Sequence, residues 1–127
     1  PEKVPVLDKA LTALLQDLQS RGLLKKTLVV LTSEFGRSPK INERSGRDHH
    51  PAAFTTVLAG AGIKQGYVHG ASDKKGHGVD KDPVRVQDFN ATIARVVGID
   101  TKQEVFSATR RPFTVADDGE PVAELLT

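Results

Sequence analysis

The apolar positions near the start of the chain follow a helical period. Pro5 suits the first turn of a helix, and Gly22 suits the position just past its end. We therefore predict an amphipathic helix over residues 5–21. Its buried stripe is expected to consist of Leu7, Ala10, Leu11, Leu14, Leu15 and Leu18.

Two short runs with the composition of strands follow this helix. Residues 27–32 (TLVVLT) carry apolar side chains without alternation, which is typical of a parallel strand covered on both faces. Residues 53–59 (AFTTVLA) predict a second buried strand. A helix, a short link and a buried strand form one half of a βαβ unit, so the pattern indicates an α/β fold.

The remaining chain alternates between polar loops and shorter elements. Long loops are predicted over residues 33–51 and 71–82, with a short strand at 67–69 between them. A second helix is expected to begin near Asp88 and to stop at Gly98. For the tail we predict a strand at 113–115, a turn at 117–119 and a short helix or strand at 121–126.

Composition narrows the classes of function. The chain has 18 basic and 16 acidic residues, which is too weak a surplus for a nucleic-acid footprint. Its apolar runs are far shorter than the ~20 residues that cross a bilayer, so we expect neither nucleic acid nor membrane as a partner. The chain has no cysteine, which excludes disulfides and thiol catalysis within it.

The first residues indicate that the chain is a fragment of a longer protein. The chain begins Pro1–Glu2, contains no methionine and enters a helical pattern almost at once. We therefore expect residues 1–127 to be a single domain that forms the C-terminal portion of a longer one. A truncated sheet leaves an open apolar edge, so a homo-oligomer through that edge is also expected.

Residues that could hold a metal ion gather in the loops. Glu34 follows the first predicted strand, and open α/β sheets bind ligands beyond the carboxyl ends of their strands. Asp48 and His49 precede Pro51. Carboxylates and imidazoles together suit Zn²⁺ or Mn²⁺, and carboxylates alone suit Ca²⁺ or Mg²⁺. His50 and His77 are possible additional ligands.

Each candidate also has a structural interpretation. Glu34 could act as a cap or pair with Arg37, and Asp48 could cap the Gly46–Arg47 turn. Arg37 and Arg47 could clamp a phosphate or sulfate through paired hydrogen bonds, although a solvated arginine is more common. Ser33 lacks the surroundings of a nucleophile elbow, so a hydrolytic site would need a metal-activated water or a nucleophile from elsewhere.

Three stretches together resemble one known family. They are TLVVLTSEFGRSP, GRDHHPAAFTTVLAGAGIKQGYVHGASD and DPVRVQDFNATIARVVGID. They are similar to the C-terminal part of domain of unknown function family 1501, whose members look like sulfatases and alkaline phosphatases. The likeness runs from about Leu7 to Val122, and the pairing of EFGRSP with GRDH is its most specific part.

The resemblance implies a partial, truncated doubly wound sheet of the alkaline phosphatase-like type with a metal site at the strand ends. Sulfatases carry a T-S-D-[NH] motif there, so Glu34 takes the place of the ligand Asp and Phe35 replaces the second ligand. Asp48 and His49 match the family's D-H pair, whereas Asn90 stands where many relatives carry His.

The implied function is that of a metal-dependent hydrolase of sulfate or phosphate esters. Its nucleophile would lie in the absent N-terminal part, so this piece alone should be inactive. The parent is expected to be exported, because family members commonly carry a twin-arginine signal. The alternative is a non-catalytic sulfatase-like domain that serves as a binding or scaffold protein.

Overall fold

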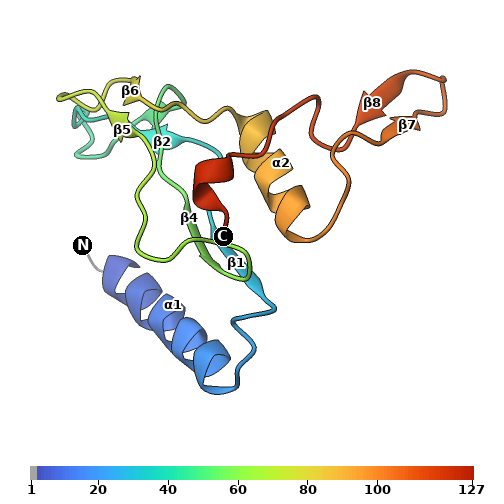
Figure 1. The fold of residues 1–127 in the computed structure, drawn as a ribbon. Coiled ribbons are helices and arrows are strands. Elements are labelled where there is room, and N and C mark those ends of the chain that lie inside the picture. Colours follow the sequence, from blue (N-terminus) through green and yellow to red (C-terminus); the bar gives the residue numbers. More distant parts are fainter. Residues whose placement is uncertain (1–2) are drawn as a thin grey trace.

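The computed structural model describes residues 3–127 and shows a mixed α/β arrangement of helices and small antiparallel strand pairs (Figure 1). The elements, in chain order, are α1 (Lys3–Ser20), β1 (Leu28–Leu31), β2 (Gly36–Arg37), β3 (His49–His50), β4 (Val57–Gly60), β5 (Ala71–Ser72), β6 (Val79–Lys81), α2 (Val86–Val96), β7 (Glu104–Phe106), β8 (Pro112–Thr114) and the 3₁₀ helix η1 (Ala123–Leu125).

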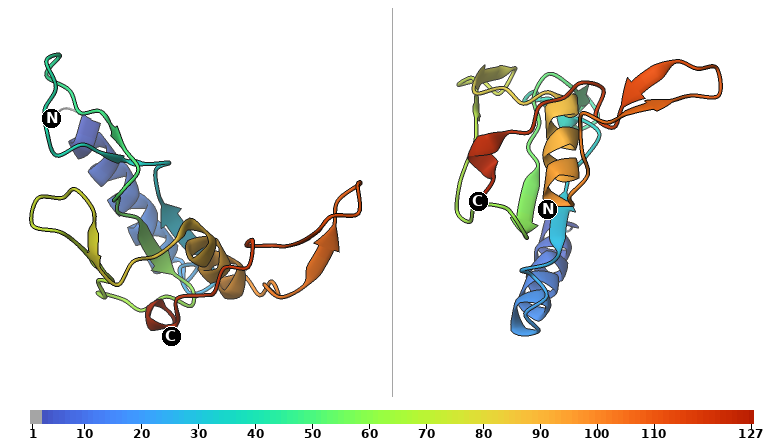
Figure 2. Two further views of the ribbon diagram at one scale, coloured as in Figure 1. Left: turned by 90° about the horizontal axis from the view of Figure 1, so that it is seen from above. Right: turned by 45° about the vertical axis from the view of Figure 1, so that its right-hand side comes forward.

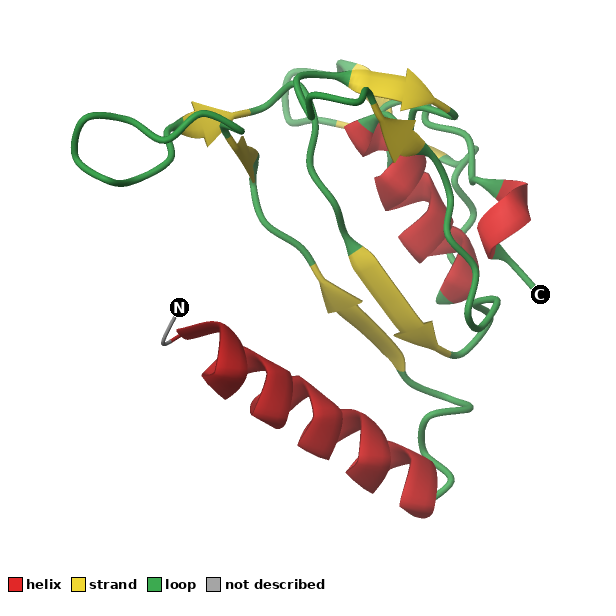
Figure 3. Cartoon of the chain, turned by 90° about the vertical axis from the view of Figure 1, so that its left-hand side faces the viewer, coloured by secondary structure: helices red, strands yellow, loops and turns green. Residues whose placement is uncertain are grey.

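The central strand pair joins β1 to β4 and is antiparallel (Figure 3). Its register runs from Leu28 opposite Gly60 to Leu31 opposite Val57. The expectation that β1 is a parallel strand in this pair is therefore wrong. All four β1 residues are half-buried rather than fully covered. An unbroken apolar run indicates that both faces of a strand have neighbours, but it carries no information about strand direction.

The first predicted helix is confirmed, and α1 begins two residues before the predicted start. The prediction that its leucine stripe is buried is wrong. No described residue of α1 is buried, and the side chains of Leu7 and Leu14 are 50% and 47% exposed. Figure 1 shows the β1–β4 pair between α1 and α2. A helical period reports which positions share a face, whereas burial depends on what packs against that face.

The second helix holds the small core. α2 starts two residues before Asp88, and Gly98 follows it with a positive φ of 81°, as its predicted role as a helix stop requires. The buried side chains come mainly from α2, joined by others from the loop after β4 and from the tail. They are Ala91, Thr92, Ala94, Ile63 and Ala116.

Three predictions about loops and short strands need correction. The loop predicted over 33–51 contains the β2–β3 pair, and the loop predicted over 71–82 contains the β5–β6 pair. No strand forms at 67–69. The tail matches better, since β8 lies within a residue of its predicted start and η1 falls inside 121–126. The β7–β8 hairpin extends away from the other elements (Figure 2).

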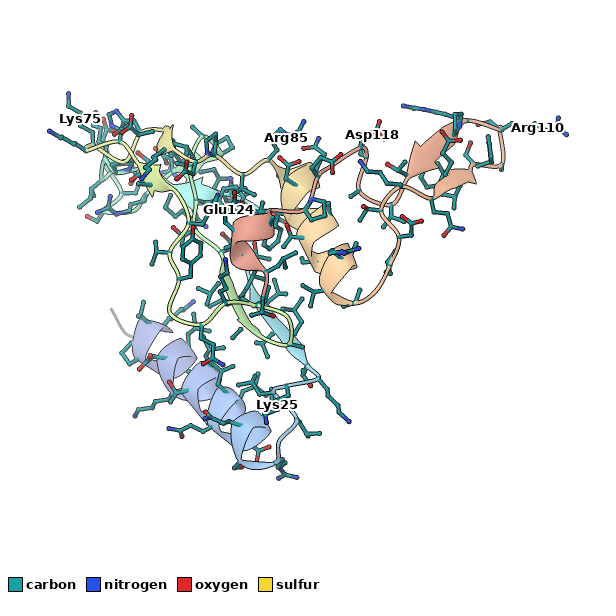
Figure 4. All side chains as sticks on the ribbon, viewed as in Figure 1. Lys25, Lys75, Arg85, Arg110, Asp118 and Glu124 are labelled. Carbon is teal, nitrogen blue, oxygen red and sulfur yellow. The ribbon has the colours of Figure 1, made fainter. Side chains whose placement is uncertain are left out.

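Two side chains of α2 form hydrogen bonds with the C-terminal segment. The Asp88 carboxylate accepts hydrogen bonds from Arg85 at 2.6 and 2.8 Å and from the backbone N–H of Glu120 at 3.0 Å. The Thr92 hydroxyl donates to the Asp88 carbonyl at 2.7 Å and accepts from the N–H of Val122 at 2.9 Å. Figure 4 shows Arg85 at the start of α2. Neither the length nor the hydropathy of a membrane-spanning helix is found in any helix among residues 3–127.

Candidate metal and anion site

The β2–β3 pair brings together the two segments that carry the candidate ligands. In its register Gly36 lies opposite His50 and Arg37 lies opposite His49. The close approach needs a glycine, because a Cβ on Gly36 would lie 2.2 Å from the carbonyl oxygen of Ala53. The chain just beyond β1 and the D-H-H segment are therefore hydrogen-bonded neighbours, with Glu34 beyond one end of the ladder and Asp48 beyond the other.

The aromatic ring of Phe35 lies against the imidazole of His49. The ring centroids are 3.8 Å apart and the planes are inclined by 29°. The guanidinium carbon of Arg37 lies 5.5 Å from the centroid of the same phenyl ring, within the range of a cation–π contact. Phe35 offers no ligand atom, and its ring instead restrains the imidazole that the sequence predicts to be a ligand.

Glu34 lies on the wall of an open groove of about 690 Å³. Its side chain is exposed, and no ion pair joins it to Arg37 among residues 3–127, so the alternative in which Glu34 pairs with Arg37 is not supported. The residues lining the groove come from the link between β1 and β2, from β2 itself and from the segment before β4. They are Ser33, Glu34, Phe35, Gly36, Arg37, Ala53, Phe54 and Thr55.

Asp48 is oriented by an asparagine that the sequence analysis did not single out. One oxygen of its carboxylate accepts a hydrogen bond from the side-chain amide of Asn42 at 2.8 Å. The amide oxygen of Asn42 in turn accepts from the backbone N–H groups of Arg44 and Gly46. Asp48 therefore does not cap the preceding turn; Asn42 does so and also holds the carboxylate.

The two arginines of the candidate anion site already contact backbone oxygens. Arg37 donates to the carbonyl of Arg47 at 3.2 Å. Arg47 donates to the carbonyls of Ser38, at 2.8 Å, and Pro39. Both side chains are exposed, and both fasten the 38–47 loop. Of the two, Arg37 borders the groove beside Glu34, so it is better placed to reach an anion.

The two additional histidines meet through a backbone contact. The Nε2 atom of His50 lies 2.9 Å from the carbonyl oxygen of His77, which joins β3 to the β5–β6 loop. That loop turns around Asp73, whose carboxylate accepts backbone hydrogen bonds from Lys75, His77 and Gly78. Those bonds, with His77 the largest contributor, lower the pKa of Asp73. Figure 4 shows Lys75 on this loop.

The candidate side chains are of types that bind metal ions, but they do not converge on one point in this structure. Glu34, Asp48 and His49 offer carboxylate oxygens and an imidazole nitrogen, which are ligands for Zn²⁺ or Mn²⁺. Within residues 3–127, no group of three such side chains is close enough to hold an ion. Glu34 and Asp48 lie beyond opposite ends of the β2–β3 pair, and the shared metal site stays a prediction.

Comparison with known proteins bears on the family but not on the activity. The profile of a family described as "Protein of unknown function (DUF1501)" matches residues 1–126. No curated protein and no solved structure matches the chain. The matched region covers nearly all of the 127 residues, and the chain therefore belongs to the DUF1501 family.

Proposed function

We propose that this chain forms part of the site of a metal-dependent hydrolase of sulfate or phosphate esters, within a sheet of the alkaline phosphatase-like type. The observation that carries the proposal is the β2–β3 register. It sets Arg37 opposite His49 and so places the segment after Glu34 against the segment that starts at Asp48. Glu34 precedes β2 and Asp48 precedes β3, so in this antiparallel pair the two carboxylates lie beyond opposite ends of the ladder, and a shared ion requires the flanking loops to close around it.

Each of these residues has a specific role in the proposed site. Glu34, Asp48 and His49 would hold the ion, and Arg37 would hold an oxygen of the ester. The ion would act as a Lewis acid that stabilises negative charge in the transition state. Asn42 fixes the rotamer of Asp48, and Phe35 limits the rotation of the His49 ring. Since no nucleophile is evident in this chain, hydrolysis requires groups from outside it.

Calorimetric titration of the chain with Zn²⁺ and Mn²⁺ tests the proposal. We expect one saturable site, weakened at least ~10-fold by Glu34→Gln, Asp48→Asn or His49→Ala. Glu104→Gln, on the distant β7, removes a carboxylate charge of the same kind and should leave the affinity unchanged. Absence of saturable binding, or variants that bind as tightly as the wild type, would overturn the proposal.

A second candidate function is a non-catalytic module that binds sulfated or phosphorylated groups. The observation that favours it is that no three-ligand group is formed among residues 3–127. Such a module would bind a sulfated oligosaccharide equally well with and without a chelator, and Arg37→Gln would weaken that binding. Binding that requires added Zn²⁺ or Mn²⁺ would instead favour the metal-dependent hydrolase.

A further inference from the structure

The strand β3 consists of two histidines and pairs with β2 through two residues only. An isolated two-stranded pair is marginally stable, so a ladder this short holds β3 weakly. Neighbouring side chains on a strand point to opposite faces, and His49 and His50 therefore meet different neighbours. The ring of His49 stacks on Phe35 on one face. The orientation of β3 then depends on what holds His50 on the other face.

The ring of His50 is bound by the backbone of the β5–β6 loop. Its Nε2 atom lies 2.9 Å from the carbonyl oxygen of His77, 27 residues further along the chain. A carbonyl oxygen only accepts hydrogen bonds, so Nε2 of His50 carries the proton and donates it. His50 is half-buried, whereas His49 is exposed. This hydrogen bond therefore limits the rotation of the His50 ring.

The direction of the His77 carbonyl is set by the carboxylate of Asp73. One carboxylate oxygen accepts from the N–H groups of Lys75 and His77, at 2.7 and 3.2 Å, and the other accepts from the N–H of Gly78 at 2.8 Å. The carbonyl of His77 and the N–H of Gly78 belong to the same planar peptide group. A carboxylate that binds this N–H therefore also orients the carbonyl toward His50.

We propose that Asp73 is a positioning residue of the candidate metal site, because it holds the ring of His50 through the His77–Gly78 peptide group and so fixes the orientation of β3. This role rests on the proposed function, since His49, a proposed ligand, is the neighbour of His50 in β3. Metal ligands depend on such outer contacts, whose removal lowers metal affinity about 10–100-fold.

The ring proton of His50 reports on this contact in the absence of metal. A hydrogen-bonded Nε2–H exchanges slowly with water, so it should give a resonance in the imidazole region of a ¹H–¹⁵N spectrum. We expect Asp73→Ala to abolish the resonance and Asp73→Asn, which keeps one acceptor oxygen, to weaken it less. The matched control, Asp80→Ala, removes an exposed carboxylate from β6 and should leave it unchanged. A resonance that is absent from the wild type, or that survives Asp73→Ala, would overturn the proposal.

Calorimetric titration with Zn²⁺ measures the consequence for the site. The affinity should fall about tenfold in Asp73→Ala and stay at the wild-type value in Asp80→Ala. His50→Phe keeps a ring but has no N–H, and should weaken binding by a similar factor. The double variant Asp73→Ala/His50→Phe should bind no more weakly than either single variant, because both changes break the same contact.

The outcomes separate this role from the proposed function. Normal Zn²⁺ binding by the wild type and equal binding by Asp73→Ala would overturn the role of Asp73 alone. Additive losses in the double variant would do the same, because Asp73 would then act by another route. A wild-type chain that binds no Zn²⁺ would overturn the proposed function and the metal role of Asp73 together.

Discussion

Phe35, the residue before β2, and His49, in β3, form a stacked pair with ring centroids 3.8 Å apart. These residues are far apart in sequence, and the β2–β3 register brings them together. The resemblance to sulfatases expects a second metal ligand at position 35. The phenyl ring instead packs on a candidate ligand, so the substitution exchanges a donor atom for a restraint on its neighbour.

The stack predicts a change in the spectrum of His49. In Phe35→Leu the imidazole protons should lose the upfield ring-current shift and move downfield in a ¹H–¹³C correlation spectrum. The free energy of unfolding should fall by about 0.5–1.5 kcal/mol, the value of an aromatic pair. Phe106→Leu, at an exposed position of β7, is the matched control and should leave His49 unshifted. An unchanged His49 spectrum in Phe35→Leu would show that the rings do not stack.

Replacement of Gly36 should disrupt the hairpin. A methyl group there would lie 2.2 Å from the carbonyl oxygen of Ala53, so Gly36→Ala should cost about 1–3 kcal/mol of unfolding free energy in a urea titration. Gly46→Ala is the control, since its Cβ would lie 3.5 Å from the nearest atom of Asn42, an ordinary contact. Equal stability of the two variants would contradict the close β2–β3 packing.

The hydroxyl of Thr92 should protect the amide of Val122 from hydrogen exchange. Thr92 is fully buried, and its oxygen accepts that N–H at 2.9 Å. Thr92→Val keeps the shape but leaves a buried N–H without its acceptor, so we expect a loss of about 1–3 kcal/mol and faster exchange at Val122. Thr92→Ser retains the acceptor and should keep Val122 protected. Loss of protection in both variants would assign it to packing alone.

The pairing of Asp88 should make stability fall in acid. The side-chain hydrogen bonds from Arg85 and the backbone N–H of Glu120 hold the pKa of Asp88 well below the ordinary 3.8. Because the native pKa is the lower one, this stabilisation is complete above pH 3.8 and is lost as the pH falls toward the native value.

Thermal unfolding of Asp88→Asn against pH tests this linkage. The variant should melt below the wild type near neutral pH, and the difference in Tm should shrink as the pH falls below 3.8. Asp8→Asn, on the exposed surface of α1, should follow the wild-type curve at every pH. A Tm difference for Asp88→Asn that stays constant down to the lowest pH would contradict the assignment.

The helices could be predicted from sequence, whereas the strand directions could not. A 3.6-residue period and a terminal glycine identify α1 and α2 because both signals are local. The antiparallel β1–β4 pairing depends on how the intervening chain returns, which the apolar pattern of β1 does not encode. The β5–β6 pair was not predicted, because its strands are short and polar and carry no apolar pattern. They are joined by a turn in which the Asp73 carboxylate accepts backbone hydrogen bonds.

The sequence identified candidate residues for the site, but it did not predict the contacts that these residues make with their neighbours. Glu34 lies at the groove, whereas Asp48 and His49 do not line it, and the antiparallel register sets Asp48 beyond the other end of the ladder. The role of Asn42 was not foreseen, because its contact with Asp48 arises only once the 38–47 loop closes. The stack of Phe35 on His49 likewise depends on a two-residue ladder too short to show any alternation.

Paramagnetic broadening by Mn²⁺ tests most directly whether Glu34, Asp48 and His49 serve one ion. Substoichiometric Mn²⁺ should broaden the amide resonances of residues 33–37 and 48–50 together in a ¹H–¹⁵N spectrum, and an excess of Mg²⁺ should not reproduce the pattern. We expect His49→Ala to abolish the broadening in both segments. Broadening confined to one segment, or spread evenly over the acidic surface, would contradict a shared site.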